Sequence, residues 1–226
     1  RDSQWAVFDP NNFELFNDDD ANLGFGSVSF SAMTFSNVTG VGLIGNADST
    51  INAQVVLSDF QANTGSFNGD LGQLLSYQAS GGIAAGFAGI CNPNSDNSLS
   101  FSSIDASYST APTYSWSVMV VTHEFGHLWG SRHTHACVWN GNNTAIDGCS
   151  GSTEGSCALP GYPSQGGTLM SYCHLQSVGI NFNEGFGTQP GDVIRNSVAN
   201  ASCTAPCGPP TCIDGIQNGN ETGVDC

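Results

Sequence analysis

The sequence predicts an α+β domain, with an α/β-like succession of strands and helices around one core. Two β-leaning runs, at residues 27–35 and 51–60, indicate strands near the N-terminus. A proline-free segment at 115–129 is dense in apolar residues and predicts a helix, and a further helix is expected at 190–200. Hydrophobic residues make up 39% of the 226 residues, which is enough to build one core.

The expected order before the long helix is strand, strand, helix, strand. Residues 27–35 partly alternate between polar and apolar side chains, and residues 51–60 carry three consecutive aliphatic residues at their centre. Residues 68–78 place three leucines at helical spacing behind Asn68, a candidate cap, and therefore predict a short helix. Residues 81–91 are rich in glycine and predict a return to extended structure.

The helix at 115–129 is the most distinct element of the sequence. Pro112 stands just before it and Gly130 just after it, which are common start and stop signals. Residues 131–187 are rich in Gly, Ser, Asn and Cys without a sustained period, so they predict irregular structure tied by disulfides. In the helix at 190–200, the proline falls in the first turn and the apolar side chains share one face.

A domain boundary is expected near residue 205. Residues 1–205 form the main domain, and residues 206–226 read as a linker followed by the start of a small cysteine-containing module. Because the chain opens abruptly at Arg1, a signal or pro-segment is expected to have been removed. No run approaches the roughly 18 apolar residues that a membrane-spanning helix needs, so membrane insertion is not expected. The protein is expected to be a monomer.

Acidic residues dominate the charge of the protein. Nineteen Asp and Glu residues face three arginines and no lysine, and the formal net charge is −16. Such a surface repels phosphates, which argues against nucleic acid and anionic membranes as partners. The acidity is interpreted as an aid to solubility or an adaptation to salt, with attraction of cationic substrates as the alternative.

Nine cysteines indicate an oxidising, extracellular location. They do not form the paired C-x-x-C spacings of a structural zinc site, so disulfides are the better explanation. The protein is therefore expected to be secreted. An odd number leaves one cysteine without a partner inside the chain.

One motif carries the chemistry. The segment that begins at His123 reads H-E-F-G-H-L-W-G-S-R-H and fits the pattern H-E-x-x-H-x-x-G-x-x-H. On a helix, His123 and His127 lie one turn apart on the same face, so both imidazoles can reach one zinc ion at about 2.0–2.1 Å. Gly130 can adopt the positive φ that ends the helix and lets His133 reach the same ion. Three imidazoles leave one position open to water, on which Glu124 can act.

The motif, together with the downstream turn T-L-M-S-Y at 168–172, resembles the signature of metzincin peptidases. In that family a methionine lies beneath the three histidines as an apolar floor, a role that falls to Met170 here. The resemblance implies a zinc metalloendopeptidase acting on proteins or peptides, in which Glu124 takes a proton from the zinc-bound water and delivers it to the leaving amine. It also implies a twisted, mostly parallel sheet backed by helices in an upper subdomain of about residues 1–130, above an irregular lower subdomain at about 131–205.

Within the metzincins, the cysteine-rich segment at 137–149 most resembles the reprolysin-like, or adamalysin-type, branch. Two positions differ from many reprolysins: Thr134 follows the third histidine in place of aspartate, and Tyr172 replaces a proline. The M-S-Y turn is similar to that of serralysins, in which the tyrosine can bind zinc reversibly. Tyr172 is therefore expected to point its hydroxyl toward the zinc site, either as a weak ligand or as a hydrogen-bond donor to the tetrahedral intermediate.

The resemblance also implies a set of disulfides. Reprolysin-like domains join a cysteine upstream of the active-site helix to one near the C-terminus, which corresponds to Cys91 with Cys203 here. The other expected pairs are Cys137 with Cys149, Cys157 with Cys173, and Cys212 with Cys226, which leaves Cys207 as the odd cysteine.

Some alternatives stay open at this point. His135 and His174 are expected not to bind the metal, because a fourth histidine would close the catalytic position. The run Asp18-Asp19-Asp20 is a candidate calcium site, but it lacks a calcium-loop pattern, so a solvated loop is expected. Two rival functions remain: a catalytically silent adhesion or binding module on the same fold, and a zinc hydrolase of a non-peptide amide. The presence of Glu124 argues against the silent module.

Overall fold

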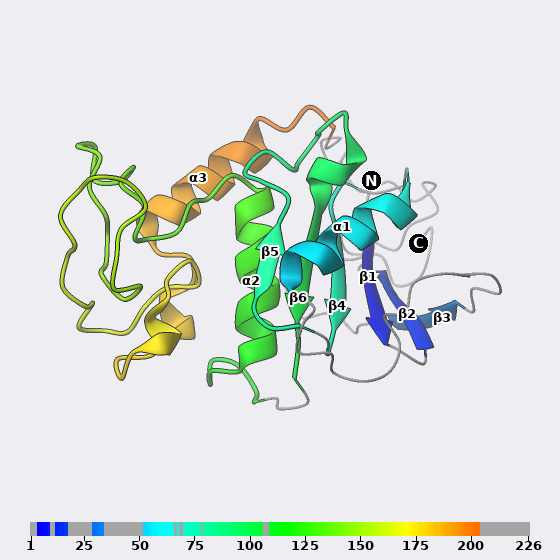
Figure 1. Cartoon of the computed structure of the whole chain (residues 1–226), viewed down its shortest axis with the longest axis horizontal. Coiled ribbons are helices and arrows are strands. Elements are labelled where there is room, and N and C mark those ends of the chain that lie inside the picture. Colours follow the sequence, from blue (N-terminus) through cyan, green and yellow to red (C-terminus); the bar gives the residue numbers. More distant parts are fainter. Residues whose placement is uncertain are drawn as a thin grey trace, which may run out of the picture.

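The computed structural model describes residues 52–203, with gaps at 66, 68–69, 78 and 106–108, together with the backbone of three N-terminal strands. The chain combines groups of strands with helices, which agrees with the predicted α+β class (Figure 1). The helices and strands are, in chain order, β1 (Gln4–Asp9), β2 (Asn12–Asn17), β3 (Ser29–Met33), α1 (Ala53–Thr64), β4 (Gly72–Ser76), β5 (Gly82–Ala84), β6 (Leu99–Ser103), α2 (Trp116–Leu128) and α3 (Thr188–Ala199).

The strands form two three-stranded sheets. Strands β1, β2 and β3 make an antiparallel meander, which confirms the strand predicted at 27–35. The second sheet has the order β4-β6-β5, with β4 parallel to β6 and β5 antiparallel to it. This sheet is mixed, where a mostly parallel one was expected. The connection at 77–81 is too short for the crossover that parallel strands need, so β5 runs in the opposite direction and occupies an edge.

The prediction of a strand at 51–60 was wrong, because this segment forms α1. The side chain of Asn52 accepts the N–H of Val55 at 3.1 Å and so caps the helix. Val56 and Leu57 are buried with Phe60 packed beside them, a spacing that fits one face of a helix. The aliphatic run is thus a core-facing surface, and packing overrides the weak preference of its valines for strands.

The prediction of a helix at 68–78 was also wrong, because this segment contains β4. Gln73 and Leu74 are neighbours in the strand and both are buried, so β4 is covered on both faces. A strand buried on both faces carries apolar residues without alternation, and a short run of this kind fits helix and strand patterns equally well. The proposed cap, Asn68, lies outside the described residues.

The core lies between the helices and the second sheet. The helix predicted at 115–129 is confirmed as α2, which packs along β5 and β6. Two polar contacts add to this packing: the amide of Gln73 donates to the carbonyl of Val121, and the hydroxyl of Ser102 to that of Val120, both at 3.3 Å. One apolar cluster joins α1 to the sheet through Val56, Leu57, Leu74, Leu99 and Phe101. The packing and the two hydrogen bonds together fix the position of α2 against the sheet.

The lower part of the chain is irregular, as predicted. Residues 131–187, all of them described, contain short 3-10 turns and isolated bridges in place of longer helices or sheets. The helix expected at 190–200 is confirmed as α3, which begins two residues earlier. It passes close to the end of α2, since a Cβ at Gly130 would lie 3.0 Å from the hydroxyl of Ser197.

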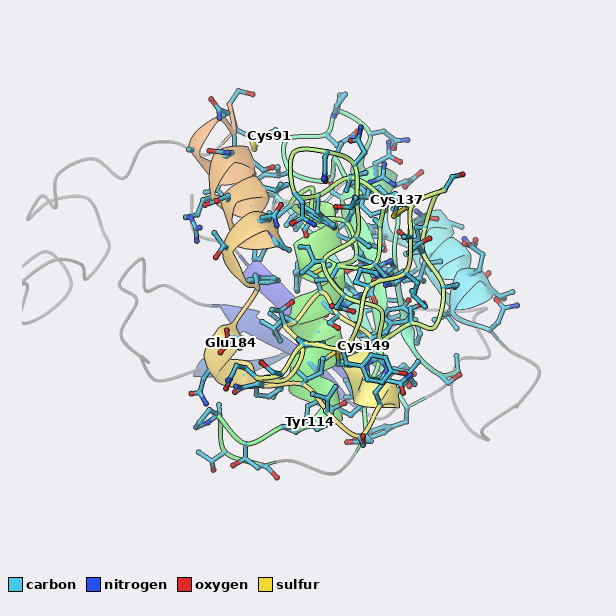
Figure 2. The ribbon with its side chains drawn as sticks, turned by 90° about the vertical axis from the view of Figure 1, so that its left-hand side faces the viewer. Cys91, Tyr114, Cys137, Cys149 and Glu184 are labelled. Carbon is cyan, nitrogen blue, oxygen red and sulfur yellow. A yellow bond between two sulfur atoms is a disulfide. The ribbon has the colours of Figure 1, made fainter. Side chains whose placement is uncertain are left out.

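Three disulfides join described cysteines (Figure 2). Cys91 pairs with Cys203, as expected, and closes a loop across most of the described chain. The two local predictions were wrong, because the observed bonds are Cys137–Cys157 and Cys149–Cys173. A parallel bridge between residues 136 and 154 brings Cys137 beside Cys157, and the two disulfide loops therefore interleave. The remaining predicted pair and the odd cysteine lie outside the described residues: Cys207, Cys212 and Cys226.

Among the described helices, none combines the length and apolar character that crossing a membrane requires.

Candidate metal centre

Three histidine side chains meet at the C-terminal half of α2. The Nε2 atoms of His123 and His127, one helical turn apart, are 3.1 Å from each other. Nε2 of His133 lies 3.0 Å from that of His127. His123 and His127 are buried, and the His133 side chain is 15% exposed. The structure therefore brings together the three ligands that the motif predicted.

The turn after α2 carries His133 to this cluster. Gly130 has a φ of 100°, which confirms the predicted positive φ. The N–H groups of Gly130 and Ser131 donate to the carbonyls of His127 and Gly126, at 2.8 and 3.0 Å. These bonds end the helix and direct the next residues back toward it.

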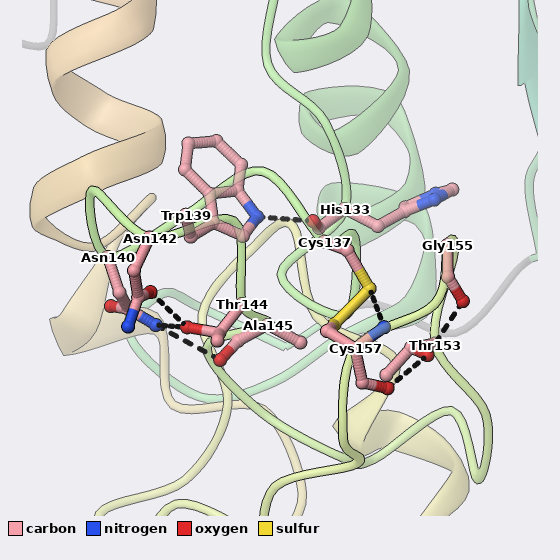
Figure 3. The surroundings of a disulfide bond; sticks show 10 residues. All are labelled: His133, Cys137, Trp139, Asn140, Asn142, Thr144, Ala145, Thr153, Gly155 and Cys157. Atoms are coloured by element: carbon pink, nitrogen blue, oxygen red, sulfur yellow. Dashed lines mark hydrogen bonds between the residues drawn. A yellow bond between two sulfur atoms is a disulfide. The ribbon is translucent and has the colours of Figure 1, made fainter.

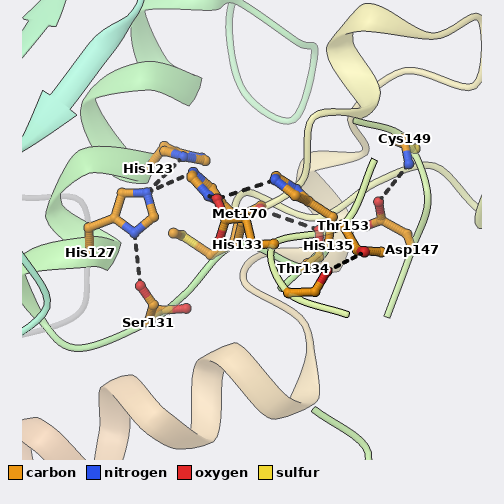
Figure 4. Close-up of polar contacts among 12 residues, drawn as sticks. His123, His127, Ser131, His133, Thr134, His135, Asp147, Cys149, Thr153 and Met170 are labelled. Atoms are coloured by element: carbon orange, nitrogen blue, oxygen red, sulfur yellow. Dashed lines mark hydrogen bonds and ion pairs between the residues drawn. The ribbon is translucent and has the colours of Figure 1, made fainter. Parts of the chain in front are cut away.

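Each of the three rings is also held through its other nitrogen, Nδ1, and Figure 4 shows the bond from His127 to Ser131. The partners are the carbonyl oxygen of Leu169 for His123 at 2.6 Å, the carbonyl oxygen of Ser131 for His127 at 2.8 Å, and Oε1 of Glu154 for His133 at 2.6 Å. Carbonyl and carboxylate oxygens accept hydrogen bonds, so the ring proton sits on Nδ1. Every Nε2 consequently keeps its lone pair and faces the other two.

This arrangement fits a zinc ion. Three acceptor atoms at about 3 Å from their neighbours repel one another unless a cation lies between them. With zinc–nitrogen bonds of about 2.0–2.1 Å in a tetrahedral site, ligand nitrogens lie about 3.4 Å apart, close to the separations observed. Three protein ligands leave room for water and substrate, which is typical of catalytic zinc sites.

Burial keeps the histidines neutral. The pKa of His123 lies well below its ordinary value because of burial and, next, the proximity of His127 and His133. Burial likewise lowers the pKa of His127 and of His133. Neutral imidazole is the form that binds metal, so protons compete with zinc less than they would at exposed histidines.

Glu124 lies between α2 and the edge strand β5. Its carboxylate accepts a hydrogen bond from the backbone of Ala84, and a Cβ at Gly82 would lie 2.5 Å from its Oε1. The side chain is buried, and this burial raises the pKa of Glu124 to about 8, against the lowering effect of the Ala84 bond. A carboxyl group with such a pKa can accept and return a proton near neutral pH.

Met170 is fully buried and packs under α2. A Cβ at Gly126, which lies between the two helical ligands, would be 2.5 Å from the sulfur of Met170. The backbone carbonyl of Met170 accepts the N–H of Thr134 at 3.1 Å. Met170 thus links the turn at 168–172 to α2 and to the segment after the third histidine, a position that fits the expected apolar floor.

Tyr172 lies beside the histidine cluster. Its ring centroid is 4.8 Å from that of His133 and 6.0 Å from that of His123. Burial raises the pKa of Tyr172, with further contributions from Glu124 and Glu154, so the phenol stays protonated and able to donate.

The two remaining histidines lie near the cluster without joining it. The His135 ring stacks on that of His133, with centroids 4.8 Å apart, and its Nε2 is 3.4 Å from Oε1 of Glu154. The His174 ring lies 5.7 Å from that of Tyr172. Neither belongs to the three-histidine group, but His135 forms a second set of possible metal ligands with His133 and Glu154. That neither histidine binds the metal stays a prediction.

Two neighbours of the site were not predicted. Glu154 bonds His133, and the ring of Phe87 meets that of His127 edge-on at 5.3 Å. Glu154 follows His133 by 21 residues in an aperiodic segment, so no spacing rule identifies it. Correct pairing of Cys137 with Cys157 is the signal that would have placed it near the third ligand.

Comparison with known protein families agrees with this geometry. A reprolysin model described as metallo-peptidase family M12 matches residues 7–180, which is well over half of the chain. The match includes the three histidines, Glu124 and Met170. No curated protein matches the sequence. The chain therefore belongs to metallo-peptidase family M12.

Proposed function

We propose that the protein is a secreted, zinc-dependent metalloendopeptidase that hydrolyses peptide bonds in proteins. One observation carries the proposal: three histidine lone pairs converge beside a buried carboxyl group, in a chain that belongs to a peptidase family. When bound, zinc polarises the scissile carbonyl and makes the attacking water a stronger acid.

Glu124 carries out the proton transfers. Its carboxyl group takes the proton of the attacking water and delivers it to the nitrogen of the leaving amine. The raised pKa supports this role, because a base with a pKa near the working pH can both take up and release the proton. Contact of the carboxylate with Ala84 holds it on the β5 side of the site.

Strand β5 supports the substrate. It lies at one edge of the β4-β6-β5 sheet, and Glu124 packs against it. An extended peptide that adds to this edge would place its backbone beside the Glu124 carboxyl group. Binding as an added strand favours unfolded or extended segments of proteins as substrates.

Tyr172 donates a hydrogen bond to the substrate oxygen that gains negative charge during attack. Its closeness to His133 and its protonated phenol support this assignment, and so does the M-S-Y sequence of the turn.

Secretion is supported by the three disulfides, which persist in oxidising compartments. A removed pro-segment and a monomeric state remain predictions. The candidate calcium run at residues 18–20 lies outside the described residues.

A cleavage assay with casein and with fluorescence-quenched peptides as substrates tests the proposal. Zinc-loaded protein should cleave both, a chelator should stop cleavage, and added zinc should restore it. A folded, zinc-loaded protein that cleaves neither would favour a silent binding module. Hydrolysis confined to non-peptide amides would favour the second rival function.

A further inference from the structure

One of the three proposed zinc ligands is held differently from the others. Nδ1 of His123 and Nδ1 of His127 donate to backbone carbonyls, whereas Nδ1 of His133 bonds a side-chain carboxylate, Glu154, at 2.6 Å. His133 is also the one ligand that lies outside α2. Its orientation therefore depends on contacts made by the irregular segment rather than on the helix.

The backbone of Glu154 is anchored next to His133. Its N–H donates to the carbonyl of His135 at 3.0 Å, and its carbonyl accepts the N–H of Cys137 at 2.8 Å. These bonds form a parallel bridge between residues 136 and 154. Glu154 is thereby attached to the same short stretch of chain that carries the third ligand.

A disulfide closes the segment immediately beside this bridge (Figure 3). Cys137 follows the bridge on one side and Cys157 on the other, and the N–H of Cys157 also lies 3.0 Å from the sulfur of Cys137. Gly155 fits between them at a φ of 119°, where a Cβ would lie 2.8 Å from that of Cys137. Most residues from 151 to 156 are exposed, so this part of the chain depends on the covalent bond together with the backbone hydrogen bonds of the bridge.

We propose that Glu154 is a positioning residue for the third zinc ligand, and that the Cys137–Cys157 disulfide sets the zinc affinity through it. The inference rests on the proposed zinc site. A carboxylate that accepts the Nδ1 proton fixes the ring of His133 with Nε2 toward the ion, and it makes that nitrogen a stronger donor to the metal. Reduction of the disulfide would free Glu154 and weaken zinc binding without touching a ligand.

The first test is the zinc dissociation constant, measured by competition with a chromophoric chelator. Partners of this kind typically change metal affinity by about 10–100-fold, so Glu154→Ala should bind zinc that much more weakly than the wild type. Glu154→Gln keeps an acceptor oxygen without the charge and should fall between the two. The visible spectrum of the cobalt-substituted protein should change in the same order.

The second test is a double-mutant cycle with Cys137→Ser/Cys157→Ser. If the disulfide acts through Glu154, this variant should lose affinity, and adding Glu154→Ala should lower it little further. Gly155→Ala offers an independent variant, because it keeps both cysteines and Glu154 while displacing the segment. It should weaken zinc binding in the same direction.

Matched controls separate the proposed effect from a general loss of fold. Glu184→Ala removes an exposed carboxylate elsewhere, and Cys91→Ser/Cys203→Ser removes a disulfide outside residues 133–157; both should keep the wild-type zinc affinity. Unchanged affinity in Glu154→Ala, or full additivity in the cycle, would overturn the proposal. The proposal would also be overturned if the wild type bound two equivalents of zinc and Glu154→Ala bound one, since His133, His135 and Glu154 would then form a metal site of their own. Wild-type protein that binds no zinc would instead refute the proposed function.

Discussion

The environment of Glu124 defines its chemistry. The side chain is buried against β5, and its pKa is raised to about 8 because burial disfavours the charged form. The neighbouring residue His123, a proposed zinc ligand, has its pKa lowered by burial as well. The pKa values of two adjacent residues in one buried helix turn are thus shifted in opposite directions, which favours a neutral imidazole at His123 and lets the Glu124 carboxyl group exchange a proton near neutral pH.

Replacement of Glu124 with glutamine separates catalysis from metal binding. Glutamine keeps the size of the side chain but cannot take up the proton, so kcat/KM on a peptide substrate should fall by about 10²–10⁴-fold. Zinc content, measured by atomic absorption, should stay close to one equivalent. Replacing His123, His127 or His133 by alanine should remove zinc and activity together. Loss of zinc in Glu124→Gln, or near-normal activity, would contradict the role assigned to Glu124.

The pH dependence of the metal-free protein reports on the same carboxyl group. The pKa of Glu124 is higher in the folded chain, about 8, than its ordinary value of 4.5. Between these values the folded state holds a proton that the unfolded state has released, so this group makes the free energy of unfolding fall as pH rises, by up to about 1.4 kcal/mol per unit. Urea denaturation from pH 5 to 8 should therefore show wild type losing stability relative to Glu124→Gln. The histidines are common to both proteins, and a constant difference would argue against the raised pKa.

Tyr172 has a narrower predicted role. Tyr172→Phe removes the hydroxyl and keeps the ring that packs beside His133. If the hydroxyl stabilises developing charge, kcat should fall by about 10–10³-fold while KM and zinc content change little. Steady-state kinetics on the peptide used for Glu124→Gln would measure this. An unchanged kcat would reduce Tyr172 to a packing residue.

At the scale of elements, the contact between α2 and β5 positions Glu124, the proposed base. The absence of a side chain at Gly82 leaves the space that the Glu124 carboxylate occupies, since a Cβ there would approach its Oε1, Cγ and Cδ to 2.5–2.8 Å. The two elements therefore define one side of the site together.

Gly82→Ala should displace the Glu124 carboxylate while leaving the three histidines in place. Misplacement of a catalytic group by about 1 Å can cost as much as 10²-fold, so a loss of roughly 10–100-fold in kcat with full zinc content is expected. Gly86→Ala is the matched control, because a Cβ at that position meets nothing within 4 Å. Equal losses in both variants would place the effect on the backbone around residues 82–86 rather than on Glu124.

The elements that sequence analysis identified correctly have long or punctuated patterns. Helix α2 is proline-free between Pro112 and Gly130, and α3 begins around Pro190. The two misassigned elements, α1 and β4, carry only short apolar runs and contribute to the core, where packing partners decide the structure. The aliphatic run of α1 and the leucines of β4 fit either periodicity, and the register with β6 that settles β4 is a long-range contact.

At the scale of the whole molecule, Cys91–Cys203 joins the segment between β5 and β6 to the residues just after α3, across a sequence separation of 112. Closing so long a loop removes conformational entropy from the unfolded chain, worth about 4–5 kcal/mol in the chain-entropy account. Cys91→Ser/Cys203→Ser should therefore lower the melting temperature by roughly 10–15 °C in scanning calorimetry. An unaltered melting temperature would show that the bond restrains only a locally unfolding end of α3.

The site was more predictable than the fold around it. The ligands, Glu124 and Gly130 occupy fixed spacings within eleven residues, because a helix and one turn must bring them together. Glu154 obeys no such local geometry, since a bridge and an interleaved disulfide pattern bring it to His133. Pairing Cys137 with Cys149 and Cys157 with Cys173, in chain order, was the simpler prediction. That pairing gives no indication that Glu154 lies beside His133.

The three facing lone pairs also leave the metal-free fold electrostatically frustrated. Each Nδ1 hydrogen bond keeps the ring proton on Nδ1, so no Nε2 carries a proton that could relieve the repulsion between the three lone pairs. The geometry that suits the ion therefore destabilises the fold without zinc. Zinc binding then stabilises the folded state. The free energy of unfolding rises with the ratio of the free zinc concentration to the zinc dissociation constant. In surroundings poor in zinc, a larger share of chains would open transiently and be degraded by other peptidases. The lifetime of the protein would thus depend on the local supply of zinc.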